Sequence, residues 1–148
     1  MANSRPLRDN YLGVWGWVWA GRYRVERYLY LLHRITGLGI VLYGAIHLCV
    51  MTIFRMQGES FYSSVMSAFE NPIFKVGEYL VFAALIYHSL NGFRLILQEL
   101  GFLLGKPKPP VFPYKDALRR KRPFVHAMLG LVVIAAAFVL YDFVRGGP

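Results

Sequence analysis

The chain has 148 residues, 56% of them hydrophobic, and a formal net charge of +9. A soluble domain of this size could not bury so much apolar surface, so the composition predicts a membrane protein. The positive charge is gathered in two blocks, residues 4–27 and 105–122, which flank apolar stretches. Such blocks are typical of the positive-inside rule for membrane helices, and this distribution argues against nucleic-acid binding.

The single cysteine, Cys49, lies within an apolar run. An intrachain disulfide, a paired-thiolate zinc site and an iron–sulfur ligand set are therefore excluded for this chain alone. The polar N-terminus carries three tryptophans and does not look like a cleaved secretory signal.

In chain order, residues 1–34 are expected to form a cytoplasmic N-terminal segment. Its aromatic cluster at residues 11–30 suits a position on the inner membrane surface. Residues 35–54 carry no charge, and twenty helical residues span about 30 Å, enough to cross a bilayer. Residues 55–75, with two basic and two acidic side chains, are expected to form an outer loop.

The second span is predicted at residues 76–98, and its apolar part carries one charge, Glu78. We expect the helix to continue beyond the hydrocarbon until Gly105 and the following prolines stop it. A basic cytoplasmic loop is assigned to residues 99–122, a third span to residues 123–142 and an outer tail to residues 143–148. The fold class is thus an all-α membrane protein with three transmembrane helices, a cytoplasmic N-terminus and an outer C-terminus.

Each of the first two spans contains a histidine, His47 and His88. A neutral imidazole in hydrocarbon needs a polar partner, which could be a hydrogen-bonding group on a neighbouring helix. One histidine on each of two glycine-flanked helices points instead to a bound metal cofactor. Helical spacing places one series of residues on a single face of the first helix: His33, Gly37, Ile40, Gly44 and His47. The glycines could serve helix packing, or leave room for a flat macrocycle whose iron binds His47.

His47 and His88 are predicted to lie at different depths in the membrane. His47 lies thirteen residues from Arg34, about 20 Å along the helix, whereas His88 lies six residues from Arg94, about 9 Å. They should therefore not share an iron. Either there are two haems, each completed by a histidine from elsewhere, or one histidine is not a ligand. His126 is the only internal candidate to pair with His88, and we interpret it by default as an interfacial polar residue.

Basic side chains stand at the inner ends of the first two spans: His33, Arg34 and Arg94. They could snorkel to lipid phosphates. Alternatively, they could donate hydrogen bonds to haem propionates or to a quinone carbonyl. Tyr30, four residues before Arg34, could add a hydroxyl to a quinone site.

Two stretches resemble a known family. LHRITGLGIVLYGAIHL resembles the HRxTG or HRxSG signature of the cytochrome b membrane anchors of succinate dehydrogenase. YHSLNGFRLILQELG resembles their second signature, an H-x3-G-x-R-H-x3-D run, but Leu95 replaces its second histidine and Glu99 its aspartate. The resemblance covers roughly residues 28–142.

The resemblance implies a subunit of complex II or of a related fumarate reductase. By it, His88 matches the haem-ligating histidine, and Arg34 matches the arginine near quinone and propionate. Tyr30 stands where many members have a quinone-binding serine. His47 resembles the first-helix ligand of the two-haem anchors.

We therefore interpret the chain as a membrane anchor of succinate:quinone oxidoreductase that binds haem b and quinone but has no catalytic residue for succinate. Expected partners are a flavoprotein subunit, an iron–sulfur subunit, a second membrane anchor and the lipid bilayer. The location would be the bacterial or archaeal cytoplasmic membrane, or the mitochondrial inner membrane. The alternative is a haem-free structural anchor or assembly subunit. The sequence leaves open one haem or two, and ubiquinone or menaquinone.

Overall fold

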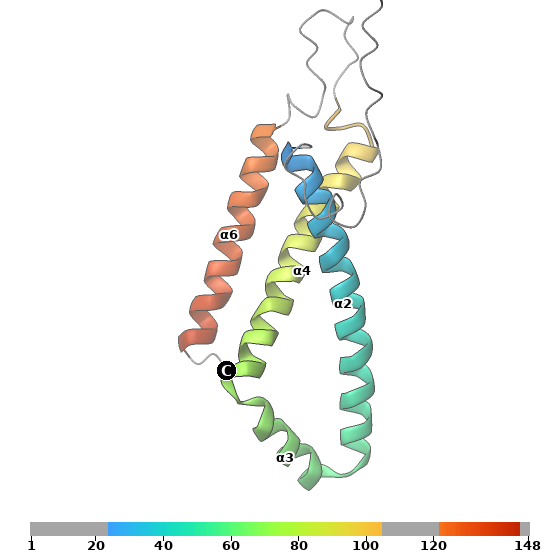
Figure 1. The fold of residues 1–148 in the computed structure, drawn as a ribbon, viewed down its shortest axis with the longest axis vertical. Helices are drawn as coiled ribbons and strands as arrows, with labels where there is room; N and C mark the ends of the chain where they lie inside the picture. The colour runs from blue at the N-terminus through green and yellow to red at the C-terminus, as the bar shows by residue number, and fades with distance from the viewer. Residues whose placement is uncertain (1–23, 105–121, 146–148) are drawn as a thin grey trace, which may run out of the picture.

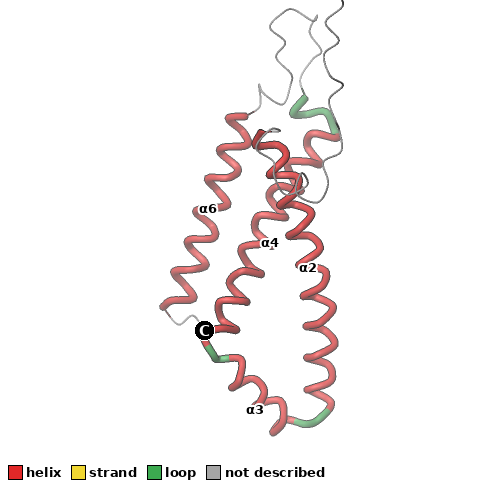
Figure 2. Tube along the Cα trace, in the orientation of Figure 1, coloured by secondary structure: helices red, strands yellow, loops and turns green. Residues whose placement is uncertain are grey.

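The computed structural model describes residues 24–104 and 122–145, and all regular structure in these ranges is helical (Figure 2). The helices are α2 (Arg24–Met56), α3 (Glu59–Phe69), α4 (Pro72–Glu99) and α6 (Arg122–Arg145). Within the described ranges, α2, α4 and α6 are long and apolar enough to cross a membrane. The predictions of an all-α fold and of three helices able to span a membrane are confirmed.

Helix α4 lies between α2 and α6, and the three long helices alternate in direction (Figure 1). The starts of α2 and α6 and the end of α4 therefore lie together, and we call this the proximal end. An ion pair of 3.1 Å between Glu26 and Arg122 joins the two helix starts there. Toward the opposite, distal end α2 and α4 diverge, and α3 connects them (Figure 1).

The best-packed part of the helix bundle is proximal. Leu29 of α2, Tyr87 of α4, and Val125 and Met128 of α6 form one buried cluster. The Tyr87 hydroxyl donates a 2.8 Å hydrogen bond to the backbone carbonyl of Leu29. Much of the remaining apolar surface of the long helices is exposed in the isolated chain, as expected for helices that lipid or other membrane subunits cover.

Several boundaries differ from those expected, and α4 begins at Pro72 rather than at residue 76. Helix α2 begins at Arg24, so residues 24–34 belong to the same continuous helix as the span at 35–54. Residues 1–23, with most of the aromatic cluster, lie outside the described ranges, as do residues 105–121 of the basic loop. The expected outer loop contains α3. This helix begins after Gly58, whose backbone has a positive φ of 100°.

The expected continuation of the second helix to Gly105 is wrong. Helix α4 ends at Glu99, because Gly101 adopts a positive φ of 83°. The amide of Gly101 donates to the Gln98 carbonyl, and the amide of Phe102 donates to the Leu97 carbonyl, each at 3.0 Å. This is a Schellman C-cap, which a glycine adopts without the steric penalty of a Cβ.

Candidate functional site

Near the proximal end, the imidazole rings of His33 on α2 and His88 on α4 stack in parallel. Their centroids are 4.0 Å apart and their planes differ by 4°. Nδ1 of His88 lies 3.1 Å from the His33 backbone carbonyl oxygen and 3.2 Å from Oγ1 of Thr36. Because a carbonyl oxygen can only accept, Nδ1 of His88 must carry the proton. Its Nε2 then holds a free lone pair, which is the tautomer needed for metal ligation through Nε2.

The two helices approach closely here because glycines face the histidines. A Cβ on Gly37 would lie 2.7 Å from Cε1 of His88. On the other helix, a Cβ on Gly92 would lie 3.5 Å from Cε1 of His33. Gly44, on the same predicted face as Gly37, has nothing within 4 Å of its Cβ position. Gly37 therefore creates room for His88, whereas Gly44 borders open space in the isolated chain.

A buried polar group lies one turn further along α4. Arg94 is 6% exposed and Asn91 is fully buried. Nε of Arg94 donates a 3.0 Å hydrogen bond to Oδ1 of Asn91. Arg94 is thus held inside the helix bundle, and a snorkelling side chain would not be buried in this way.

Two buried polar atoms of this region have no hydrogen-bond partner among the described residues: Nδ1 of His33 and Nδ2 of Asn91. An unsatisfied buried polar atom costs about 1–3 kcal/mol, so native proteins usually supply a partner from water, a ligand or another chain. The proximal site therefore has unused hydrogen-bonding capacity for a polar group from outside this chain.

Arg34 and Tyr30 lie on a different face of α2, where both are exposed. A guanidinium nitrogen of Arg34 donates a 2.9 Å hydrogen bond to the Tyr30 hydroxyl. The predicted proximal residues thus fall into two groups. His33 and Arg94 lie in the seam between α2 and α4, while Arg34 and Tyr30 form a pair on the surface of α2.

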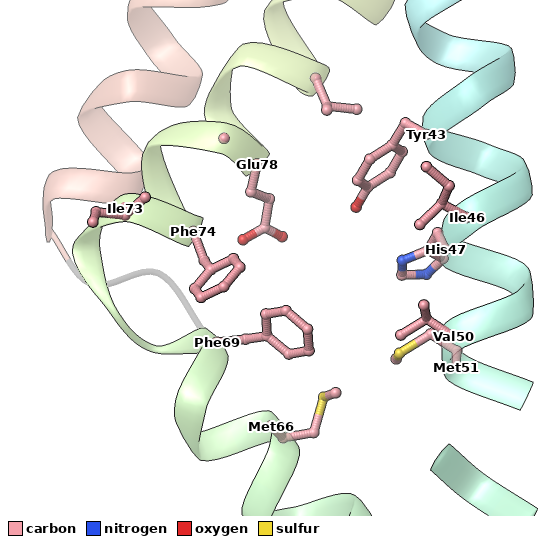
Figure 3. A pocket seen from close by; sticks show the side chains of 12 residues that line it. Tyr43, Ile46, His47, Val50, Met51, Met66, Phe69, Ile73, Phe74 and Glu78 are labelled. Atoms are coloured by element: carbon pink, nitrogen blue, oxygen red, sulfur yellow. The ribbon is translucent and has the colours of Figure 1, made fainter. Parts of the chain in front are cut away.

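His47 lines a distal pocket of about 570 Å³ between α2, α3 and α4 (Figure 3). Its ring stacks loosely on Tyr43, with 5.5 Å between the centroids, and faces Glu78 and Phe74 of α4 (Figure 3). The complete lining is Tyr43, Ile46, His47, Val50, Met51, Met66, Phe69, Ile73, Phe74, Gly77, Glu78 and Val81. The volume lies within the range of small-molecule and cofactor sites, and the lining is mostly apolar with few polar groups, as such sites usually are.

The separation in depth inferred from the sequence is present in the structure. His88 contacts α2 at His33, Thr36 and Gly37, whereas His47 lies ten residues beyond Gly37, about 15 Å along the helix. His33 cannot complete an iron site with His88 in this arrangement, because an imidazole binds metal in the plane of its ring and these rings stack face to face. His126 is exposed on α6 and has no described contact with His88.

The residues fit an axially ligated haem better than a bare metal ion. No group of three or more His, Cys, Asp or Glu side chains within the described ranges could hold an ion. A haem supplies the equatorial nitrogens itself and needs only one axial histidine from each side. His88 offers a free Nε2 beside polar atoms that lack partners, and His47 offers an imidazole in a mostly apolar pocket.

Thr36 and Asn91 are candidate site residues that the sequence analysis did not single out. Thr36 is part of the HRITG motif, three residues after His33, and Asn91 follows His88 by one turn. Helical spacing alone could have placed both near the histidines. Their significance lies in hydrogen bonds and burial, which depend on how α2 packs against α4.

Comparison with known proteins places the chain in a family. Residues 18–141 match the family described as the succinate dehydrogenase/fumarate reductase transmembrane subunit. The chain belongs to this family. It is a multi-pass membrane subunit, and the matched range includes every candidate site residue from Tyr30 to Arg94.

Two relatives have printed names that agree with this assignment. The chain is 31% identical over 96 residues to the succinate dehydrogenase 2 membrane subunit SdhC of Mycobacterium tuberculosis, covering 63% of this chain and 60% of that protein. It is also 31% identical over 90 residues to the succinate dehydrogenase hydrophobic membrane anchor subunit of Halobacterium salinarum, covering 60% and 58%. The matches thus span about three-fifths of the relatives' lengths. No solved structure matches the chain significantly.

The glycine contact predicts that Gly37→Ala destabilises the protein by about 1–3 kcal/mol, the usual cost of overpacking. The added Cβ would push the His88 ring away from its two hydrogen-bond acceptors on α2. Gly44→Ala is the matched control on the same helix, because its Cβ meets nothing within 4 Å and alanine favours the helix. Thermal denaturation of the purified membrane protein would measure the difference, and equal midpoints for the two variants would contradict the prediction.

Proposed function

We propose that this chain is a membrane anchor of succinate:quinone oxidoreductase that binds haem b and quinone. In this role it passes electrons from an iron–sulfur subunit to the quinone pool. The observation that carries the proposal is the hydrogen-bonded state of His88. Its Nδ1 is held by two acceptors and its Nε2 is left for a metal, in a chain that belongs to this family.

At the proximal site, His88 would hold the haem iron through Nε2. His33 and Arg94 offer donors to the propionate carboxylates, and the buried position of Arg94 strengthens its interaction with an anion. The bound haem supplies one-electron transfer. A further ligand would come from a second membrane anchor, because His33 stacks on His88 and no other described histidine of this chain lies beside it.

At the distal site, His47 is the proposed ligand of a second haem. Support comes from the pocket of about 570 Å³ and from the absence of a described hydrogen-bond partner for the imidazole. Its surroundings differ from those of His88, since the imidazole faces apolar side chains and the Glu78 carboxylate. The opposing ligand again has to come from another chain.

Tyr30 and Arg34 are the proposed quinone contacts. They lie near the proximal end of α2, and their hydrogen bond holds a guanidinium and a phenol together on an exposed face. Both groups can donate to a quinone carbonyl oxygen. The resemblance also places Arg34 near a propionate, but its exposed position favours the quinone role over contact with a haem in the α2–α4 seam.

A haem-free structural anchor remains the second candidate, and one observation favours it. His88 already has acceptors for its Nδ1 proton, so part of its polarity is satisfied without a metal. This alternative leaves the two buried atoms of His33 and Asn91 without partners. A pyridine haemochrome assay on the purified complex separates the two functions, since the structural anchor would contain no haem.

The proposed partners are a flavoprotein, an iron–sulfur subunit and a second anchor. Names of the two relatives refer to succinate dehydrogenase, which supports this assembly. The basic blocks favour a cytoplasmic proximal end. The organisms of the two relatives, a bacterium and an archaeon, favour the cytoplasmic membrane of such a cell over the mitochondrial inner membrane.

Two haems at different depths predict different effects of the two histidine substitutions. His88→Ala should remove the proximal haem and His47→Ala the distal haem, so each variant should lose one of two haems from the purified complex. Haem content and redox titration of the visible spectrum measure this. His126→Ala is the control, because that histidine is exposed on α6 and belongs to neither site. Loss of the same redox component in both variants would refute separate haems.

Arg34→Leu should assemble but lose at least about tenfold of the succinate:quinone activity. Succinate oxidation by a dye that accepts electrons before the quinone site should survive. The reason is loss of a charged donor to the quinone carbonyl. The matched control is Arg145→Leu, since Arg145 packs on Tyr141, also four residues before it, but at the distal end. Equal loss of both activities in Arg34→Leu would assign Arg34 to assembly instead.

The charge distribution predicts that the end of α4 faces the cytoplasm and α3 the outer side. In a Cys49→Ala background, which removes the exposed native thiol, single cysteines at Glu99 and Ser63 test this orientation. An impermeant maleimide applied to intact cells should label Ser63→Cys but not Glu99→Cys, and inverted vesicles should give the reverse. Labelling of both positions from one side would contradict the three-span topology.

A further inference from the structure

We propose that Thr36 is a positioning residue for the haem that His88 binds. Its hydroxyl, together with the backbone carbonyl of His33, would fix the ring orientation and the protonation of His88. The inference rests on the proposed haem function. It adds a residue whose side chain contacts the iron-ligating ring rather than the haem or the quinone.

The direction of each hydrogen bond follows from the distances. Oγ1 of Thr36 lies 2.8 Å from the Leu32 carbonyl oxygen, 3.1 Å from that of His33 and 3.2 Å from Nδ1 of His88. A hydroxyl has one hydrogen, and the shortest contact, to Leu32, is the best place for it. A lone pair of Oγ1 is then free to accept from the Nδ1–H of His88. The ring proton is shared between Thr36 and the His33 carbonyl.

Burial and close packing around Thr36 favour its hydrogen bond with His88. Thr36 is 9% exposed because its side chain faces α4. The two helices therefore limit access of competing water. The neighbouring residue, Gly37, has no Cβ and therefore allows the His88 ring to come this close. Three neighbouring groups of α2 thus face the His88 ring: the His33 carbonyl, the Thr36 hydroxyl and the Cα of Gly37, which carries no side chain. The stacked His33 ring limits rotation of His88 further.

Hydrogen-bond acceptors for Nδ1–H change how strongly Nε2 of the same imidazole donates electrons to a metal. They increase electron donation from the imidazole, which favours the oxidised over the reduced iron, and they orient the ring over the haem. A threonine that only satisfied its own hydroxyl within α2 would have no such effect, because its bond to the Leu32 carbonyl is complete without His88. The two interpretations therefore differ in what happens to the haem when the hydroxyl is removed.

The test compares Thr36→Val, which keeps the branched shape without the hydroxyl, with Thr36→Ser, which keeps the hydroxyl. The readouts are the midpoint potential and the low-spin EPR signal of the proximal haem in the purified complex. We expect Thr36→Val to raise the midpoint potential and shift the EPR signal, and Thr36→Ser to stay close to the wild type. Loss of the proximal haem in Thr36→Val alone would support the same conclusion.

A Thr36→Val complex with full haem content and an unchanged potential and EPR signal would overturn the inference. Equal shifts in Thr36→Val and Thr36→Ser would also overturn it, since they would reflect packing rather than the hydroxyl. The potential of the distal haem is the internal control and should not change. A wild-type complex without haem would instead refute the proposed function, so the two failures are distinguishable.

Discussion

Gly37 determines how closely α2 and α4 approach at the proximal end. The missing Cβ lets the His88 ring reach backbone and hydroxyl acceptors on α2. With the helices this close, Asn91 and Arg94, one to two turns further along α4, become buried as well. The polar character of the proximal site is therefore a consequence of helix packing, and a larger residue at position 37 would remove its basis.

Divergence of the same two helices produces the distal site. Where α2 and α4 separate, a pocket opens between them, and α3 connects the two helices (Figure 1). The pocket around His47 has a mostly apolar lining, whereas Nδ1 of His88 lies next to polar atoms of Thr36 and His33. One helix pair thus offers two histidine environments. In the proximal one hydrogen bonds fix the ring, whereas in the distal one the ring stacks loosely on Tyr43 and has no hydrogen bond to another described residue.

The sequence predicted much of this arrangement because hydrocarbon thickness and helical rise are simple constraints. Apolar run lengths identified the three long helices, and residue counting placed His47 and His88 at different depths. It did not predict where α4 ends, since the prediction relied on Gly105 and the following prolines, whereas the Schellman hydrogen bonds form at Gly101. Helix α3 was missed because eleven residues between two spans carry no transmembrane signal.

Site details were harder to predict, because they depend on relations between helices. His33 and Arg34 are adjacent in sequence, yet one stacks in the α2–α4 seam and the other is exposed with Tyr30. The resemblance grouped them, since a motif records which residues occur together and not the directions in which they point. Asn91 could be placed near His88 by helical spacing, but spacing does not show that it is the only fully buried side chain in the described ranges.

The proposed function makes cofactor binding depend on assembly. Each site offers one candidate ligand histidine, and the stacked geometry of His33 rules it out as a second ligand of the iron that His88 would bind. The second ligand must then come from another membrane chain that packs beside α2 or α4. Helix α2 is suited to this contact, because no residue in its most apolar stretch is buried in the isolated chain. A haem shared in this way would bind firmly only after the two anchors meet, so that haem incorporation and subunit association stabilise each other.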